Sequence, residues 1–350
     1  MYTLNSRRVE RIERIAETVD RLITTDIRGR GAIQKLYPPV RKRLGRSPTL
    51  LSAERLKETL ESGDFVMVAN DVLVSRFVPD AVGESDGPLG GAALARALLI
   101  GLGAKTIFVN NEGLTGMIAA TCRGANLNVL PLNRLREAEF TSAVVGFPVD
   151  DREAKEEAKV LMDEFNPKAV IAIERRGPNE KGVYHNWKGL DFSQYEAKVG
   201  RLFDEADRRG ILTIGIFDGC VCEIGSQIIG DILKELKEDF PYASKCSCPC
   251  GAGIVASTKV DIGIPSVVCN WGAYGISACL SALLEKPEVL HDKEMELRML
   301  GECVGAGAVD GATSVPSMTV DSMPARIHAY IVDILRVVVH EGLRGPYIYR

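Results

Sequence analysis

The chain has 350 residues, of which 46% are hydrophobic and 26% are charged. This length allows one large α/β domain or two ordinary ones, with a substantial core. The net charge of -4 gives no indication of nucleic-acid binding, and no apolar run is long enough to cross a bilayer. The N-terminus contains glutamates and lacks an apolar signal core, so we expect a cytoplasmic protein whose nine cysteines are thiols.

The first part of the chain is predicted to be helical. Apolar residues at helical spacing favour a helix over 6–24, which the GRG at 29–31 ends. Ser52 is a suitable N-cap for a second helix over 52–61. We therefore expect an N-terminal helical extension over 1–62 and an α/β domain over 63–350.

From Asp64 onward, short runs rich in Val and Ile alternate with helical stretches. The predicted strands are FVMVAN, KTIFVN, NLNVLPL, SAVVGF, KAVIAI and GILTIGIF, with one or two more in GIVASTKVDIGIPSVVC. Helices are predicted over 90–102, 113–122, 151–165, 194–209, 223–238, 271–285, 288–303 and 324–342. This alternation indicates an α/β fold, with a mainly parallel or mixed sheet and helices on both faces.

In open α/β sheets, ligands collect beyond the carboxyl ends of the strands. The sequence SDGPLGGAALARALL follows the first strand and places Asp86, Gly87 and Gly90 before a helix. Glycine N–H groups there could approach an anion, and Asp86 could cap the helix or reach a metal. A capped turn without a ligand is an equal alternative. The spacing matches neither a Walker loop nor a Rossmann fingerprint, and no nicotinamide, flavin or PLP signal is present.

The strand AVIAI runs into the stretch ERRGPNEKGVYHNWKGLDFS. Glu174 ends that strand, where an unpaired carboxylate would be costly to bury. Arg175 or Arg176 could form a salt bridge with it, or could bind a carboxylate of a substrate with the planar guanidinium fork. Tyr184 and Asn186 would add directional hydrogen bonds.

Two further acids, Asp218 and Glu223, flank the turn DGCVCE after the strand ILTIGIF. They could share a cation or an ammonium group, or could simply cap the following helix. We favour a site, because Glu174 ends another strand of the same sheet. Asn270, in CNWGAYGISACL, indicates close helix packing or close approach to a ligand.

The cysteines of KCSCPCG have the spacing C-x-C-x-C, which differs from the C-x-x-C of standard zinc and iron–sulfur sites. We expect Cys246, Cys248 and Cys250 to be free thiols, with a soft-metal site as the alternative. The four histidines are dispersed, so a catalytic zinc site is not expected.

Several of these motifs together resemble the D-glutamate cyclase-like C-terminal domain family. They are Glu174-Arg175 with Gly177, Gly182, Tyr184, Asn186, Gly189, Asp191 and Ser193, together with SDGPLGGAALARAL, CNWGAYGISACL and GAVDGATSVPSMTVDSMP. The family turn resembles D-G-G-N-E, whereas this sequence has DGCVCE. His185 stands where another aromatic residue, often Tyr, is expected.

The resemblance implies an α/β fold with an acidic cavity that holds a divalent cation, and a role in converting D-glutamate to 5-oxo-D-proline and water. We expect Asp86, Glu174 and Glu223 to bind Mg²⁺ or Mn²⁺, with Asp218 as a general base and Glu174 and Glu223 in the catalytic set. The partner would be a small anionic substrate, with self-association left open. The alternatives are a metal- and phosphate- or nucleotide-binding module and a metal-dependent phosphate-ester hydrolase.

Overall fold

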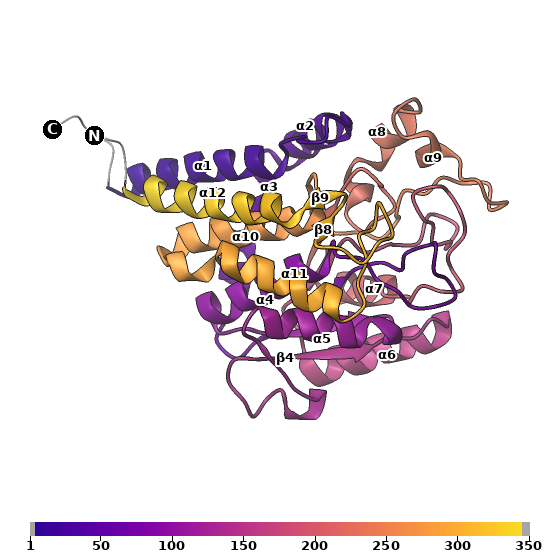
Figure 1. The fold of residues 1–350 in the computed structure, drawn as a ribbon, viewed down its shortest axis with the longest axis horizontal. Helices are drawn as coiled ribbons and strands as arrows, with labels where there is room; N and C mark the ends of the chain where they lie inside the picture. The colour runs from indigo at the N-terminus through magenta and orange to yellow at the C-terminus, as the bar shows by residue number, and fades with distance from the viewer. Residues whose placement is uncertain (1–3, 345–350) are drawn as a thin grey trace.

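The computed structural model describes residues 4–344 of the chain (Figure 1). Its α-helices are α1 (Leu4–Ile23), α2 (Ala32–Leu44), α3 (Pro48–Thr59), α4 (Pro88–Leu102), α5 (Thr115–Gly124), α6 (Asp151–Phe165), α7 (Gly200–Arg209), α8 (Gly230–Glu235), α9 (Pro241–Ser244), α10 (Cys269–Leu284), α11 (Lys293–Gly305) and α12 (Ala325–Arg344). The strands are β1 (Phe65–Asn70), β2 (Lys105–Asn110), β3 (Asn128–Val129), β4 (Thr141–Gly146), β5 (Ala169–Ile173), β6 (Leu212–Phe217) and β7 (Ile262–Pro265), with a small hairpin of β8 (Thr319–Val320) and β9 (Met323–Pro324).

Strands β1 to β7 form one sheet in the order β3-β4-β2-β1-β5-β6-β7, and every pairing in it is parallel. Parallel strands require crossover connections, which the helices between them supply. The predicted α/β fold with helices on both faces of a parallel sheet is therefore confirmed.

The chain reverses its direction of travel across the sheet next to β1. It first moves from β1 to β2 and β4, and then returns to place β5 on the other side of β1, followed by β6 and β7. Strands β1 and β5 are paired along their length, with Asn70 opposite Ile173 at the carboxyl end. A crevice forms beyond the strand ends at such a switch point, so the topology fixes where a ligand site belongs.

Side chains of alternate residues in the central strands lie in two separate hydrophobic cores, one on each face of the sheet. Val66 and Val68 of β1 face the core built with α4, α5 and α10, whereas Met67 and Ala69 face the core built with α6 and α7. Strands buried on both faces read as continuous apolar runs, which explains why FVMVAN and AVIAI lack polar alternation. Helices α1, α3 and α12 pack against α10, α11 packs against α5 and α12, and α12 lies beside α1 (Figure 1).

The N-terminal helices share the larger core. Ile15, Val19 and Ile23 of α1 are buried in it together with residues of α10 and α12. The domain boundary at residue 62 stays a prediction. Helix α2 was not predicted, because its Pro38 and Pro39 are typical helix breakers, yet Leu36 and Val40 on either side of them are buried.

Four predicted helices differ from the structure. The helix expected over 52–61 begins at Pro48 with Ser47 as its N-cap, so the prediction of Ser52 as the N-cap is wrong. The helix expected over 288–303 begins only at Lys293. The helix expected over 194–209 begins only at Gly200, since the preceding residues complete the loop after β5. The helix expected over 223–238 is replaced by a turn, a 3₁₀ segment over Ser226–Ile229 and the short α8. Gly225, with a φ of 121°, breaks the helical backbone at that point.

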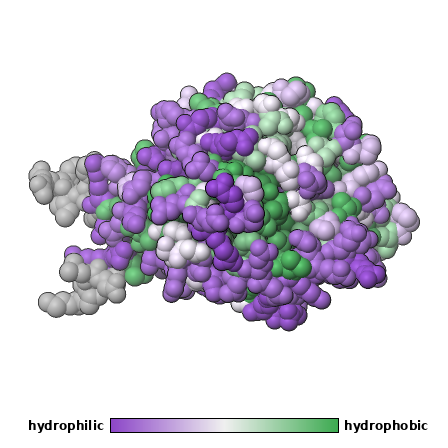
Figure 2. All heavy atoms as spheres, turned by 90° about the horizontal axis from the view of Figure 1, so that it is seen from below, coloured by the Kyte–Doolittle hydropathy of each residue, from purple (hydrophilic) through white to green (hydrophobic). Residues whose placement is uncertain are grey.

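Between residues 4 and 344, no helix is both long and apolar enough to span a membrane. The face in Figure 2 is mostly hydrophilic, with hydrophobic residues gathered toward its middle. Tyr330, Ile334 and Val337 of α12 are exposed large hydrophobic residues. Self-association and a cytoplasmic location stay predictions.

Candidate functional site

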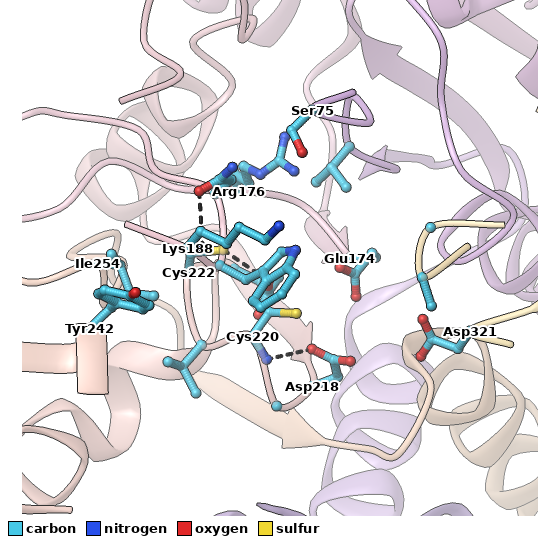
Figure 3. A pocket seen from close by; sticks show the side chains of 18 of the residues that line it. Ser75, Glu174, Arg176, Lys188, Asp218, Cys220, Cys222, Tyr242, Ile254 and Asp321 are labelled. Atoms are coloured by element: carbon cyan, nitrogen blue, oxygen red, sulfur yellow. Dashed lines mark hydrogen bonds between the residues drawn. The ribbon is translucent and has the colours of Figure 1, made fainter. Parts of the chain in front are cut away.

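A cavity of about 940 Å³ opens at the carboxyl edge of the sheet, beside the switch point between β1 and β5. Residues that follow β1, β5 and β6 line it, together with the loop after α1 and the hairpin before α12. Figure 3 shows Glu174, Asp218 and Asp321 pointing toward a common space, with Cys220 beside them. The charged residues that line the cavity include Glu84, Glu174, Asp218, Glu223, Asp321, Arg28, Arg30, Arg76, Arg176 and Lys188.

Acids from separate strand ends converge at one end of this cavity. Donor atoms of Asp86, Glu174 and Cys269 lie within 4.8 Å of one another, and so do those of Asp218, Cys220 and Glu223. The two groups adjoin, since the charges of Asp218, Glu223 and Asp86 all raise the pKa of Glu174, after the larger effect of its own burial. The predicted clustering of acids from different strands is therefore present in the structure.

Glu174 has an unusual backbone conformation for a residue with a side chain. Its φ is 48°, in the left-handed region, immediately after the last residue of β5. Such a conformation costs on the order of 1–3 kcal/mol and is concentrated at functional sites. The turn aims the Glu174 carboxylate at the cavity, where its Oε2 is buried with no hydrogen-bond partner among residues 4–344.

The turn after β6 brings Asp218 and Glu223 together in spite of the five steps between them. Asp218 Oδ1 accepts a hydrogen bond from the N–H of Cys220 at 2.7 Å, and Val221 takes a φ of 56°. Arg176 and Glu223 then form an antiparallel bridge, in which the N–H of Ile224 donates to the carbonyl of Arg175 at 2.8 Å. The longer turn is therefore accommodated by pairing with the chain that follows Glu174.

Burial and mutual repulsion raise the pKa values of these acids. Burial raises the pKa of Glu223 to about 8, with Asp218 adding to the rise. Burial, followed by the charge of Asp321, raises the pKa of Asp218 to about 6. The pKa values of Glu174, Asp86 and Glu84 are also well above their usual range, with burial as the largest cause. A cluster of this kind favours a bound cation or bound protons.

Asp86 lies one layer behind the cavity wall and holds the N-terminus of α10. Its Oδ1 accepts from the N–H groups of Gly87 and Asn270, and its Oδ2 accepts from that of Cys269 at 2.9 Å. The side chain is 2% exposed, yet it remains within reach of Glu174. It can contribute to a cation site only through lone pairs that these amides leave free.

The glycines before α4 serve close packing. Gly87 has a φ of 99°, and a Cβ on Gly90 would lie 2.8 Å from the Cα of Asn270. The N–H groups of both glycines donate to Asn270 Oδ1, at 2.9 and 2.6 Å. The anion cradle considered for this turn is therefore occupied by the Asn270 side chain, which leaves neither amide aimed at the cavity.

The two arginines after Glu174 are held by the protein itself. Arg175 is fully buried, and its guanidinium donates to the carbonyls of Asp71 and Ala197 and to Asn111 Oδ1. Arg175 is not among the described residues that line the cavity. Arg176 lines the cavity but also forms an ion pair with Glu196. The hydrogen-bond partners of Arg175 come from three segments that follow different strands, and a role of Arg175 in substrate binding stays a prediction.

Asn186 and Tyr184 are the other predicted site residues of the loop after β5, and of these two Asn186 borders the cavity. Asn186 lines it, and its Nδ2 is buried without a partner among the described residues. Its Oδ1 accepts the N–H groups of Lys188 and Leu190, which shapes the loop. Tyr184 is buried in the loop, apart from the cavity lining, with Lys198 Nζ 4.9 Å from its ring centroid.

Sequence reasoning missed several acids and bases of the cavity. Glu84 follows β1, and Asp321 lies in the TVDSMP segment whose similarity to the family was noted, although no role was assigned to it. Arg28 and Arg30 come from the loop after α1, in the segment taken as an extension. Arg28 forms an ion pair with Asp321 at 2.9 Å. The polar RGRG loop over 28–31, between two helices, was the available signal for these bases.

The acids fit a divalent cation. Oxygens of Glu174 and Glu223 are buried without a hydrogen-bond partner in the described part of the chain. Unpaired carboxylates are costly to bury, and hard oxygen donors suit Mg²⁺ or Mn²⁺. Cys220 and Cys269 also lie within donor reach, and burial raises the pKa of each thiol well above its usual range. His185 with Cys246, Cys248 and Cys250 forms a separate group that could hold a metal ion.

The sequence was compared with known proteins. No curated protein matches it. The model of the family described as D-glutamate cyclase-like, C-terminal, matches residues 19–336, which includes the loop after α1 and every acid of the cavity. The chain therefore belongs to the D-glutamate cyclase-like C-terminal domain family.

Proposed function

We propose that this protein is a metal-dependent lyase that converts D-glutamate to 5-oxo-D-proline and water. The observation that carries the proposal is the convergence of Glu174, Asp218 and Glu223 from two strand ends into one cavity, with buried oxygens left unpaired. Membership of the D-glutamate cyclase-like family supplies the substrate class.

The cyclisation forms a bond between the α-amine nitrogen and the γ-carboxyl carbon and breaks one carbon–oxygen bond of that carboxyl group. The departing oxygen leaves as water, with protons that the ammonium group supplies. The reaction therefore needs a base for the ammonium group and a group that stabilises the developing oxyanion.

Glu174 and Glu223, with Asp86 behind them, would hold the cation. Bound Mg²⁺ or Mn²⁺ would polarise the γ-carboxyl group and stabilise the negative charge on its oxygen. Asp218, whose pKa burial raises to about 6, is suited to take a proton from the ammonium group near neutral pH.

Basic groups around the acids would hold the α-carboxylate of the substrate. Arg176 and Asn186 line the cavity, and Lys188 projects into it from the loop that contains Trp187 (Figure 3). Arg28 and Arg30 lie on the side of the N-terminal helices. Because Arg176 already pairs with Glu196, we propose that the positive charges of Arg28, Arg30 and Lys188 attract the α-carboxylate of the substrate together with Arg176.

The size of the cavity favours a second candidate, a metal-dependent site for a nucleotide or phosphate ester. About 940 Å³ is more than one amino acid fills, and Trp187 and Tyr242 offer aromatic surfaces in the wall. In this alternative, the phosphate would lie against Arg28, Arg30 and Lys188, since Asn270 occupies the glycine turn.

Product formation and ligand-induced stabilisation would separate the two candidates. D-Glutamate, L-glutamate, 5-oxoproline, AMP and phosphate would each be added with Mn²⁺ or with EDTA. The lyase proposal expects Mn²⁺-dependent formation of 5-oxoproline from D-glutamate, detected by NMR, and thermal stabilisation by D-glutamate. Stabilisation by AMP alone, with no 5-oxoproline, would support the second candidate and overturn the first.

A further inference from the structure

The cysteine-rich segment 246–250 lies against the loop that follows β5 and brings three thiols to one histidine. Cys246 Sγ is 3.2 Å from Cys248 Sγ and 3.3 Å from Cys250 Sγ. His185 Nε2 is 3.3 Å from Cys248 Sγ and 3.7 Å from Cys250 Sγ. All four donor atoms lie within 4.8 Å of one another.

These separations are within about 0.6 Å of the edges of a zinc coordination tetrahedron. Zn–S bonds of about 2.3 Å and Zn–N bonds of about 2.0 Å, at tetrahedral angles, place the donors roughly 3.5–3.8 Å apart. A disulfide would bring two sulfurs to about 2.05 Å and would leave the third thiol and the imidazole unused. We propose that His185, Cys246, Cys248 and Cys250 together bind one Zn²⁺ ion.

The surroundings of the cluster suit a structural zinc ion. Four protein donors complete a tetrahedron and leave no open position for a substrate. His185 and Cys246 are buried, and Asn179 Nδ2 lies 3.5 Å from Cys250 Sγ while it donates to the Gly253 carbonyl at 2.7 Å. The N–H of Cys250 lies 3.5 Å from Cys248 Sγ. Donors of this kind orient the thiolates and stabilise their charge.

The zinc ion would fix one wall of the acidic cavity. The N–H of Ser247 donates to the Gly189 carbonyl at 3.0 Å, and Ser247 Oγ donates to the Lys188 carbonyl at 2.9 Å. The loop over 184–191 contributes Trp187 and Lys188 to the cavity, and the cysteine segment lies between Tyr242 and Ile254, which line it as well. The ion would therefore join two long loops that have little regular secondary structure.

The fourth ligand explains why the C-x-C-x-C spacing did not indicate the site. Known zinc motifs are recognised from paired cysteines close in sequence. Here the fourth donor is an imidazole from a loop that is distant in the sequence. The chain fold, and not the spacing, brings His185 to the thiols.

Metal analysis of the untagged full-length protein tests the proposal. After dialysis against EDTA, we expect about one zinc ion per chain, released by a mercurial thiol reagent. X-ray absorption should show three sulfur neighbours at about 2.3 Å and one nitrogen at about 2.0 Å. Reduced wild-type protein that takes up neither Zn²⁺ nor Co²⁺ with thiolate charge-transfer absorption would overturn it.

Variants separate this site from the acidic cavity. Cys248→Ser should lose the tightly held zinc, while Cys303→Ala, which alters a buried lone thiol, should retain it. Glu223→Gln should also retain it, because Glu223 belongs to the other group of donors. If Cys248→Ser does not fold, the Co²⁺ spectrum of the wild-type protein decides. Full zinc content in a folded Cys248→Ser protein would contradict the assignment.

Discussion

Asp86 and Asn270 each cap the helix that begins beside the other. The Asp86 carboxylate accepts the N–H groups of Cys269 and Asn270 at the start of α10, and Asn270 Oδ1 accepts those of Gly87 and Gly90 at the start of α4. Two of the segments that resemble the family are thus joined in one buried contact directly behind Glu174. The contact fixes the position of the acids that face the cavity.

Removal of the Asn270 side chain should destabilise the fold. Asn270→Ala leaves the buried N–H of Gly90 unpaired and removes the donor that Asn270 Nδ2 supplies to the Ser85 carbonyl, each costing about 1–3 kcal/mol. Urea denaturation should show a loss of at least about 2 kcal/mol in the free energy of unfolding. The exposed Asn128→Ala serves as the control and should change the free energy by less than about 0.5 kcal/mol. A neutral Asn270→Ala would show that the reciprocal capping is not formed.

Neutralisation of Glu223 should have opposite effects with and without metal. In EDTA at pH 8, Glu223→Gln should raise the melting temperature, because one of several repelling buried acids loses its charge. With Mn²⁺ present, the variant should show little of the stabilisation that the wild type gains, and the formation of 5-oxoproline should fall by at least about 100-fold. Differential scanning fluorimetry and a product assay measure the two effects.

The exposed Glu164→Gln is the matched control for that substitution. It should leave both the EDTA and the Mn²⁺ melting temperatures unchanged. Equal Mn²⁺ stabilisation of Glu223→Gln and wild type would remove Glu223 from the cation site.

The metal-free protein should become less stable as the pH rises. The pKa of Glu223 rises from 4.5 to about 8 on folding, and that of Asp218 from 3.8 to about 6. The folded state therefore binds more protons than the unfolded state between about pH 4 and pH 8, and the free energy of unfolding falls across that range. Chemical denaturation in EDTA at pH 5, 6, 7 and 8 measures the slope, which should be smaller in Glu223→Gln. A flat or rising profile would contradict the raised pKa values.

Removal of the Arg175 side chain should lower the free energy of unfolding. Its guanidinium is fully buried and pairs with Glu196 at 3.2 Å, so Arg175→Ala leaves a buried carboxylate with one partner fewer. We expect a loss of roughly 3–5 kcal/mol in the free energy of unfolding. The exposed Arg55→Ala provides a baseline for an arginine truncation at the surface. A stable Arg175→Ala protein with a raised KM alone would return Arg175 to the substrate site.

Much of the fold could be predicted from periodicity. The longer strands of the sheet are short runs rich in apolar residues, and the helix over 151–165 has the bounds that its pattern indicates. The exceptions have local causes. Helix α2 was not predicted because it contains Pro38 and Pro39. The helix expected from residue 223 is interrupted at Gly225, which has a positive φ. Such conformations depend on contacts with distant segments, which a single sequence window does not contain.

The candidate site could be predicted where an acid lies in the segment that follows a strand, as Asp86 and Glu223 also do. Glu174 and Asp218 were found in this way, because parallel strands end at a common edge. Asp321 and Arg28 come from segments far from any sheet strand and reach the cavity through the packing of α1 and α12. The cap that Asn270 forms depends on hydrogen bonds between two helix starts that are far apart in the sequence.

Anomalous diffraction from crystals soaked in Mn²⁺ tests the central claim most directly. The account predicts one strong anomalous peak among the carboxylates of Glu174, Glu223 and Asp86, at about 2.0–2.6 Å from their oxygens. Crystals of Glu223→Gln should lack this peak. A well-ordered cavity in which the only Mn²⁺ peaks lie elsewhere on the protein would contradict the account.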